Sequence, residues 1–194
     1  SGPLATWGVP TANGLRMRFE EANEAGGVHG RVLEVVVEDS QYQVPLAVKA
    51  VNKLVNVDEV FGMLGAMGTP HNNATFGMMF DAGVPSLFPA TAAVSMVEPL
   101  HPMKFSFFVS YRDQALGGMK YFVEQTGAGK VCLQRIATDY GEEVEMGFQQ
   151  GVDELGLEVV YSGGHKVTET DFVGTVTSIK NSGCELLVLG PFVK

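Results

Sequence analysis

The chain has 194 residues, of which 45% are hydrophobic and 18% charged, a composition typical of globular domains and not of disordered segments. Its net charge is −9 and its lysines and arginines are scattered without a basic stripe, which disfavours nucleic-acid binding. No apolar run approaches the roughly 18 residues of a membrane span, and no signal peptide opens the chain, an absence that a mature secreted protein would share.

Short apolar runs alternate along the chain with longer segments of helical period. The sequence predicts strands over residues 32–38, 60–64, 84–88, 105–109, 130–136, 157–162 and 185–190. It predicts helices over residues 10–25, 44–56, 71–82, 113–126, 141–155 and 171–181. Alternation of this kind is typical of βαβ units built on a parallel sheet, so we expect an α/β fold.

The opening segment SGPLATWGVP contains Trp7, the only tryptophan, among several glycines and prolines. This composition predicts a surface loop. An exposed indole in such a loop is either a surface aromatic, a plug for a small core, or a contact for a ligand.

A change of region falls where Pro99 and Pro102 bracket a polar turn. We expect residues 1–108 to form one α/β unit and residues 109–194 the first part of a second. Each unit has only three or four predicted strands, and no strand precedes the opening loop. Apolar edges would then be exposed, so we expect the chain to pack against another copy or against further polypeptide.

The residues that usually carry catalysis or bind metals are dispersed. Cys132 and Cys184 lack metal-ligand spacing, and their places at or beside predicted strands favour two buried thiols over a disulfide. No Ser/His/Asp set and no dinucleotide-binding loop is present, which argues against an enzyme on a Rossmann-like scaffold. We expect no catalytic residue, no metal site and no cofactor. The four histidines lie apart, at His29, His71, His101 and His165.

Ligands of doubly wound sheets bind at the carboxyl ends of the strands, so the loop GAMGTPHNNAT is informative. Gly65 and Gly68 allow a close approach of the backbone to a ligand. Thr69 is predicted as the N-cap of the next helix and Pro70 as its first residue. A helix N-terminus of this kind suits a carboxylate, although Thr69 could simply cap its helix.

Three further loops follow predicted strands. Thr91 could contact a ligand, but a local backbone bond is more typical of threonine in a turn. Arg112 could grip a carboxylate and Tyr111 could stack on a ligand, against the alternative that Arg112 pairs with Asp113 in solvent. Tyr140 is predicted at the mouth of a helix, either at the surface or in contact with a ligand.

The chain carries an ordered series of motifs: GPLATWG, NGLRMRFEEANEAGGVHGR, VVVEDSQY, GAMGTPHNNA, GVPSLFPAT, DYGEEVEMGF and TDFVGTVTSIKNSGCELLVLG. The series resembles the type I periplasmic solute-binding proteins of ABC transporters, the leucine/isoleucine/valine-binding class, over essentially the whole chain. The resemblance implies two doubly wound, Rossmann-like lobes with a ligand cleft between them. This chain would then be an incomplete form that lacks the first strand and much of the second lobe. It also implies a periplasmic location and a membrane permease as partner.

By this resemblance the pocket falls on Trp7, Met67, Thr69, Ala90 and Tyr140. In the branched-chain amino-acid binders, a hydroxyl at the Thr69 position helps to hold the ligand carboxylate. Their next loop reads roughly SPAAT, and its threonine helps to hold the ammonium group.

Here Phe88 stands in place of the serine, and Thr91 is displaced by one residue. The resulting pocket, with Trp7, Met67 and Phe88 and with Phe108 and Tyr111 as candidates, is apolar and aromatic. The resemblance therefore favours the subgroup that binds aromatic carboxylates such as benzoate and hydroxycinnamate derivatives. Branched-chain or other aliphatic amino acids are the alternative ligands, and a ligand-sensing receptor domain is the alternative function.

Overall fold

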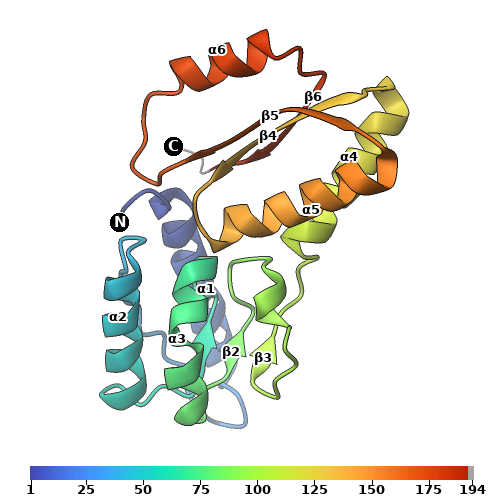
Figure 1. Cartoon of the computed structure of the whole chain (residues 1–194). Helices are drawn as coiled ribbons and strands as arrows, with labels where there is room; N and C mark the ends of the chain where they lie inside the picture. The colour runs from blue at the N-terminus through green and yellow to red at the C-terminus, as the bar shows by residue number, and fades with distance from the viewer. Residues whose placement is uncertain (192–194) are drawn as a thin grey trace. The chain divides into compact units, whose positions relative to one another are not determined.

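Helices and parallel strands alternate along residues 1–191, the part of the chain that the computed structural model describes (Figure 1). The structure divides into two units. Unit 1 comprises Ser1–Ala90 and Pro102–Phe105, and unit 2 comprises Thr91–His101 and the described residues from Ser106 onward. The division thus interleaves the two units around residue 100, whereas the sequence predicted one crossing after residue 108. The last three residues of the predicted second unit lie outside the described residues.

Unit 1 is built on a three-stranded parallel sheet with very short strands. The order is β1-β2-β3, and Met63, Ser86 and Lys104 stand in register across it. Val51 and Val55 pack against Met79 and Val84 to form its small core. The elements are α1 (Ala5–Glu24), α2 (Val44–Asn56), β1 (Met63–Leu64), α3 (Thr69–Asp81), β2 (Ser86–Leu87) and β3 (Lys104–Phe105).

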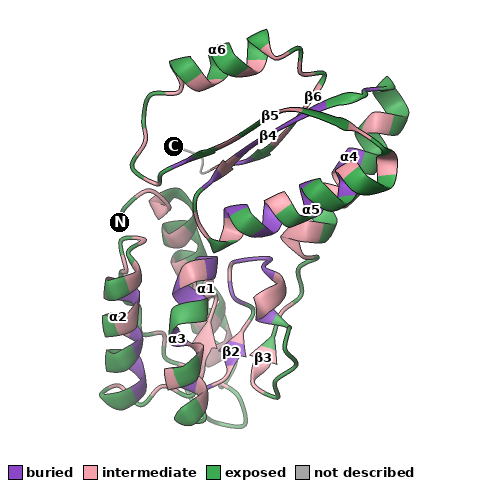
Figure 2. Cartoon of the chain, viewed as in Figure 1, coloured by how far each residue is buried: buried purple, intermediate pink, exposed green. Residues whose placement is uncertain are grey.

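Unit 2 has a sheet of longer parallel strands in the order β5-β4-β6, with α4 and α5 on one face and α6 on the other (Figure 1). The central strand is almost entirely buried, and its Val131 and Leu133 pack with Met119, Val144 and Phe148 (Figure 2). The elements are η1 (Val94–Met96), α4 (Tyr111–Thr126), β4 (Lys130–Ile136), α5 (Asp139–Leu155), β5 (Glu158–His165), α6 (Val173–Asn181) and β6 (Leu186–Gly190).

Glycines inside α5 allow it to lie unusually close to α4. A Cβ added at Gly147 would overlap the backbone carbonyl of Arg112, and one at Gly151 would meet the Met119 side chain. The backbone of α4 cannot retreat as a flexible side chain could. This seam therefore fixes the first turn of α4 against α5.

Two predicted strands depart most from the structure. Residues 32–38 belong to no helix or strand, because no neighbouring strand among the described residues pairs with them. The strand predicted over 105–109 forms only as β3, and Phe107, Phe108 and Val109 beyond it are exposed. Apolar β-branched or aromatic composition sets a preference, but a ladder also needs a partner.

The predicted opening loop is also wrong, because α1 begins at Ala5 and includes Trp7. Pro10 lies inside the helix, close enough to its start that the lost amide donor interrupts only the first turns. The Thr11 hydroxyl donates to the Trp7 carbonyl at 2.8 Å. Glycine and proline content alone therefore misled the loop prediction.

The two cysteines form a disulfide, so the predicted pair of buried thiols is wrong. Cys132 in β4 joins Cys184, which stands just before β6, with 5.9 Å between their Cα atoms. The parallel pairing of β4 and β6 brings the two residues together from 52 positions apart. The separation along the sequence did not reveal this pairing of the strands.

Candidate ligand-binding site

The loops after β1 and β2 lie side by side at the carboxyl edge of the unit 1 sheet. Met67 and Ala90 form a parallel bridge, and the Ala90 N–H donates to the Ala66 carbonyl at 2.9 Å. Two residues that the sequence predicted for a ligand pocket are thus neighbours. The bridge extends the β1–β2 pairing and holds the start of α3 beside the second loop.

Gly68 is the N-cap of α3, and the predicted capping role of Thr69 is wrong. Gly68 has φ +94°, and a Cβ there would overlap both His71 and Tyr42. Only glycine fits this turn. Thr69 is instead the first helical residue and is buried, so the helix N-terminus is formed by backbone groups around a glycine.

Asn72 fixes this loop and was missed by the sequence analysis. Its side-chain amide donates to the Ala66 carbonyl at 3.0 Å and to the Gly68 carbonyl at 2.8 Å. The residue is buried, as is His71 beside it, whose pKa is lowered by burial. The signal in the sequence was the pair of polar residues His71 and Asn72 in the first turn of the predicted helix.

Phe88 follows β2 with φ +50°, a left-handed backbone that is unfavourable for a bulky side chain. Its N–H donates to the Phe105 carbonyl at 2.7 Å, so pairing with the residue at the end of β3 helps to hold this conformation. The side chain is 48% exposed. Strain of this kind at the carboxyl edge of a parallel sheet is typical of functional loops.

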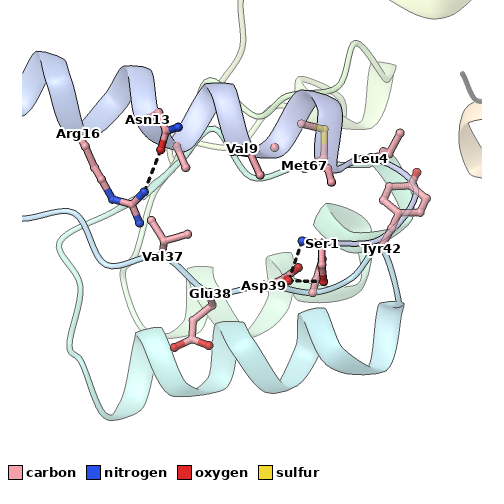
Figure 3. A pocket seen from close by; sticks show the side chains of 14 residues that line it. Ser1, Leu4, Val9, Asn13, Arg16, Val37, Glu38, Asp39, Tyr42 and Met67 are labelled. Atoms are coloured by element: carbon pink, nitrogen blue, oxygen red, sulfur yellow. Dashed lines mark hydrogen bonds and ion pairs between the residues drawn. The ribbon is translucent and has the colours of Figure 1, made fainter. Parts of the chain in front are cut away.

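Trp7 and Met67 take different positions in unit 1. Trp7 lies in the first turn of α1 and is 61% exposed, and it lines neither of the two cavities described below. Met67 lines both. The smaller cavity, of about 300 Å³, lies between the start of α1 and the segment from Val37 to Tyr42 (Figure 3). The larger cavity, a groove of about 770 Å³, lies between residues 32–38 and β1. The other predicted site residues of unit 1 line neither cavity: Gly68, Thr69, Phe88 and Ala90.

The predicted residues of unit 2 gather at the start of α4 and α5. Tyr111 and Tyr140 meet edge to face with 4.5 Å between ring centroids, and both were predicted in the pocket. Arg112 lies in the first turn of α4 and pairs with Asp113 at 3.3 Å, which was the alternative to a ligand contact. The Thr91 hydroxyl accepts from the Ala93 N–H at 3.4 Å, a local bond typical of a turn.

Glu143 ties these residues together and was missed by the sequence analysis. Its buried carboxylate accepts from the Val94 N–H at 2.9 and 3.0 Å, with the Arg112 N–H at 3.5 Å. Burial raises the pKa of Glu143, and the backbone donors oppose that rise. The available signal was an acidic residue beside Val144 on the buried stripe of α5.

A second buried polar group lies on β4 and β5. The Tyr161 hydroxyl donates to the Gln134 Oε1 at 3.0 Å, and the Gln134 Nε2 lies 3.1 Å from the His165 Nδ1. Because Oε1 accepts, Nε2 is the donor to the ring of His165. Gln134 and His165 are both buried, and His165 ends β5 at the carboxyl edge of the sheet.

Residues 1–191 offer neither a cluster of metal ligands nor a helix able to cross a membrane. No group of three or more His, Cys, Asp or Glu side chains within this range could hold a metal ion. No helix within it combines the length and the apolar character needed to cross a membrane.

Comparison with known proteins places this arrangement in a family. A family model described as "Periplasmic binding protein" matches residues 1–192. The leucine-, isoleucine-, valine-, threonine- and alanine-binding protein of Pseudomonas aeruginosa is 24% identical over 192 residues, which are 99% of this chain and 51% of that protein.

Two solved structures show the same fold. The fatty acid ABC transporter substrate-binding protein of Thermomonospora curvata matches with a TM-score of 0.90 and 22% identity, over 98% of this chain and 48% of that one. The branched-chain amino-acid transporter substrate-binding protein of Streptococcus pneumoniae, solved with isoleucine, matches with a TM-score of 0.83 and 25% identity, over 97% and 53%. The chain thus spans about half the length of each of these relatives.

Proposed function

Because the chain belongs to the periplasmic binding protein family, we propose that it is part of the solute-binding component of an ABC importer. The ligand in this proposal is a small carboxylate with an apolar group. It binds at the carboxyl edge of the unit 1 sheet, at the loops after β1 and β2. The observation that carries the proposal is the bridge between Met67 and Ala90 beside the N-terminus of α3.

The carboxylate is assigned to the start of α3. The first amides of a helix point outward without intrahelical partners, and the helix dipole there favours a negative group. Gly68 has no Cβ to shield these amides. Thr69 and the backbone beside it therefore form the anion-binding end of the proposed site.

The apolar end is assigned to Phe88, Met67 and Trp7. Phe88 and Trp7 are exposed although they are large aromatic side chains, and Phe88 is held in a strained backbone. Aromatic faces stack on flat ligands. We propose an aromatic carboxylate, of the benzoate or hydroxycinnamate type, as the preferred ligand.

Branched-chain amino acids are the second candidate. They are supported by two relatives, a leucine-, isoleucine-, valine-, threonine- and alanine-binding protein and a branched-chain amino-acid binding protein solved with isoleucine. In unit 2, Thr91, Tyr111, Arg112 and Tyr140 are proposed as further ligand contacts in either case. A membrane permease is the proposed protein partner.

An extracytoplasmic location is part of the proposal and is supported by the disulfide between Cys132 and Cys184. Disulfides persist in oxidising compartments such as the periplasm and are rare in the cytosol.

The proposed ligand class is tested by thermal-shift screening of the whole polypeptide with benzoate-type acids and with leucine, isoleucine and valine. Ligand at 100 times its Kd should stabilise the protein by about 2.7 kcal/mol. We expect the aromatic acids to raise the melting temperature more than the amino acids do. A shift with the amino acids alone would replace the aromatic proposal by its alternative, and no shift with either class would contradict the carboxylate site.

Phe88→Gly is the sharpest variant for this site. It removes the ring and relieves about 1 kcal/mol of left-handed strain, so folding is retained. The loss of a stacked ring contributes up to about 1.5 kcal/mol, which corresponds to about tenfold weaker binding of an aromatic acid by calorimetry. Phe88→Leu is the matched control for the ring, because it keeps the strain. Unchanged affinity in both variants would remove Phe88 from the site.

A further inference from the structure

Glu143 is the only carboxylate that is buried among residues 1–191. It lies near the start of α5 and is 6% exposed. Burying a charged group is costly unless strong hydrogen-bond donors replace the water that it loses. The donors around this side chain therefore indicate what it holds in place.

Two backbone amides that are far apart in the sequence converge on the Glu143 carboxylate. Val94 donates its N–H to both oxygens, at 2.9 and 3.0 Å, and the Arg112 N–H faces Oε1 at 3.5 Å. Neither amide has a backbone acceptor among the described residues. Loss of the carboxylate would therefore leave both amides without an acceptor from this part of the chain.

These amides belong to the two segments by which the chain enters unit 2, residues 91–94 and 106–112. We name them the entry segments. They also bind each other, because the Tyr111 N–H donates to the Ala92 carbonyl at 3.1 Å. Glu143 and this bond together join the entry segments to each other and to α5.

The start of α5 is a firm support for this carboxylate. A Cβ added at Gly141 would overlap the Ile136 carbonyl, so the first turn of α5 lies directly against the end of the buried strand β4. A Cβ added at Gly147 would overlap the Arg112 carbonyl. Because Glu143 and Gly147 are one turn apart on α5, the same face of the helix holds the Arg112 backbone at two points.

Four proposed ligand contacts stand on the parts that Glu143 joins. Thr91, Tyr111 and Arg112 lie in the entry segments, and Tyr140 precedes Glu143 by one turn of α5. The rings of Tyr111 and Tyr140 meet edge to face with 4.5 Å between their centroids. A shift of either entry segment would therefore move these side chains relative to one another.

We propose that Glu143 is a positioning residue of the ligand site, whose carboxylate holds both entry segments on α5 and so sets the relative placement of the four ligand contacts in unit 2. The inference rests on the proposed function, which assigns those four residues to the ligand. A carboxylate suits this place because it has two acceptor oxygens and no donor. Glutamine has the same shape but would turn an NH2 group toward an amide that also donates, so it cannot replace Glu143.

The first test measures hydrogen exchange at the amides of Val94 and Arg112 in Glu143→Gln, with the amide of Leu133 in β4 as a report on folding. We expect about tenfold faster exchange at the first two amides and no change at Leu133, because local opening no longer breaks their bonds to the carboxylate. Glu142→Gln is the matched control. It removes the same charge from the adjacent, exposed position of α5 and should change none of the three rates.

Chemical rescue separates the carboxylate from the rest of the side chain. Glu143→Ala leaves a space in which the Val94 and Arg112 amides have lost their acceptor. Formate added to this variant supplies two acceptor oxygens on a molecule small enough to enter that space. We expect formate to slow the exchange of both amides toward the rates of the unsubstituted protein. Formamide, which has a similar size but carries an NH2 group, should not.

The second test measures ligand affinity by calorimetry on the whole polypeptide, with benzoate and leucine as the probes. For the probe that the unsubstituted protein binds, we expect Glu143→Gln to weaken binding about tenfold, because the contacts in unit 2 are no longer held in the productive arrangement. Glu142→Gln should leave the affinity unchanged.

Unchanged exchange at Val94 and Arg112 in both Glu143 variants would overturn the inference. Faster exchange with unchanged affinity would also overturn it, because Glu143 would then hold the entry segments without positioning the ligand contacts, and the proposed function would stand. If neither probe binds the unsubstituted protein, the proposed function fails and the positioning role fails with it. If the substitutions also speed exchange at Leu133, recovery of all three amides with formate alone supports the inference, and equal recovery with formamide contradicts it.

Discussion

The two sheets of this molecule arise from similar sequence patterns but differ greatly in extent. In unit 2, β4 has seven residues and is paired on both sides, by β5 over its whole length and by β6 over five residues. In unit 1, β1, β2 and β3 have two residues each, and residues 32–38 join no strand ladder among the described residues. The apolar runs that predicted these strands are of similar length and composition.

The difference shows that strand formation depends on the neighbours available. β4 lies between two strands and under two helices, and its Val131, Cys132 and Leu133 are fully buried. Residues 32–38 border a groove, and most of their side chains remain exposed. Unit 2 should therefore lose much stability when single positions are changed, whereas similar changes in unit 1 should cost little.

The largest expected effect comes from the disulfide of unit 2. Cys184→Ser should lower the free energy of unfolding of this unit by about 4 kcal/mol, because the bridge closes a loop of 52 residues. Unfolding in denaturant can be followed by tyrosine circular dichroism, since four of the five tyrosines lie in unit 2, and by the fluorescence of Trp7 in unit 1. The tyrosine transition should move and the Trp7 transition should not. Equal shifts in both would show that the two units unfold as one.

The second effect compares the same substitution in the two sheets. Leu133→Ala empties a fully buried position in β4 and should cost about 3 kcal/mol. Leu64→Ala in β1 removes a half-buried side chain beside the groove and should cost less than about 1 kcal/mol. Denaturant midpoints measured with the same two probes give both values. A cost at Leu64 equal to that at Leu133 would contradict the view that the unit 1 sheet is poorly packed.

The sequence predicted element types well wherever both neighbours of an element are present. Helix α2 and strand β4 have the predicted bounds, and α3, α5 and β6 begin or end within about two residues of them. The strand prediction for residues 32–38 was wrong because strand pairing depends on tertiary neighbours, which the pattern of a single segment does not reveal. The start of α1 failed because glycine and proline are compatible with the first turns of a helix.

The third effect is a pH response of opposite sign in the two units. Burial lowers the pKa of His71 in unit 1, so its neutral form is favoured in the folded state. His71 therefore stabilises the folded state above the ordinary histidine pKa. This stabilisation is lost as the pH falls from that value through the lowered pKa. Burial raises the pKa of Glu143 in unit 2. Its contribution is present below the ordinary glutamate pKa and is lost as the pH rises through the raised one.

Acidification from pH 7 to about 4.5 should thus weaken unit 1 and strengthen unit 2 through these two groups. His71→Phe should flatten the pH dependence of the Trp7 transition, and Glu143→Gln that of the tyrosine transition. Each variant is the control for the other, because each group lies in one unit only. The explanation fails if either variant changes the pH profile of the wrong unit.

The candidate site was predicted where it rests on local chemistry and missed where it rests on packing. Gly68 was predicted from the small residues that follow a strand, and Met67 and Ala90 from the family resemblance; the structure makes Met67 and Ala90 neighbours, and their contact with a ligand stays a prediction. Glu143 was missed because its role depends on the amide of Val94, 49 residues away. The Glu143 carboxylate finds this partner only because α5 packs against the segment that follows β2, and no spacing in the sequence reveals that packing.

The smallest effect concerns helix capping, and it tests whether local capping bonds also stabilise unit 2 more than unit 1. The Ser110 hydroxyl accepts from the Asp113 N–H at 3.1 Å and caps α4, whereas Gln43 precedes α2 in unit 1 without a side-chain cap. Ser110→Ala should therefore cost about 1 kcal/mol, and Gln43→Ala close to nothing. Thr138 precedes α5, and its buried hydroxyl has no partner among residues 1–191, so Thr138→Val should be neutral or stabilising. If Ser110→Ala in the tyrosine transition is as neutral as Gln43→Ala in the Trp7 transition, the greater stability expected of unit 2 lies in its sheet and disulfide alone.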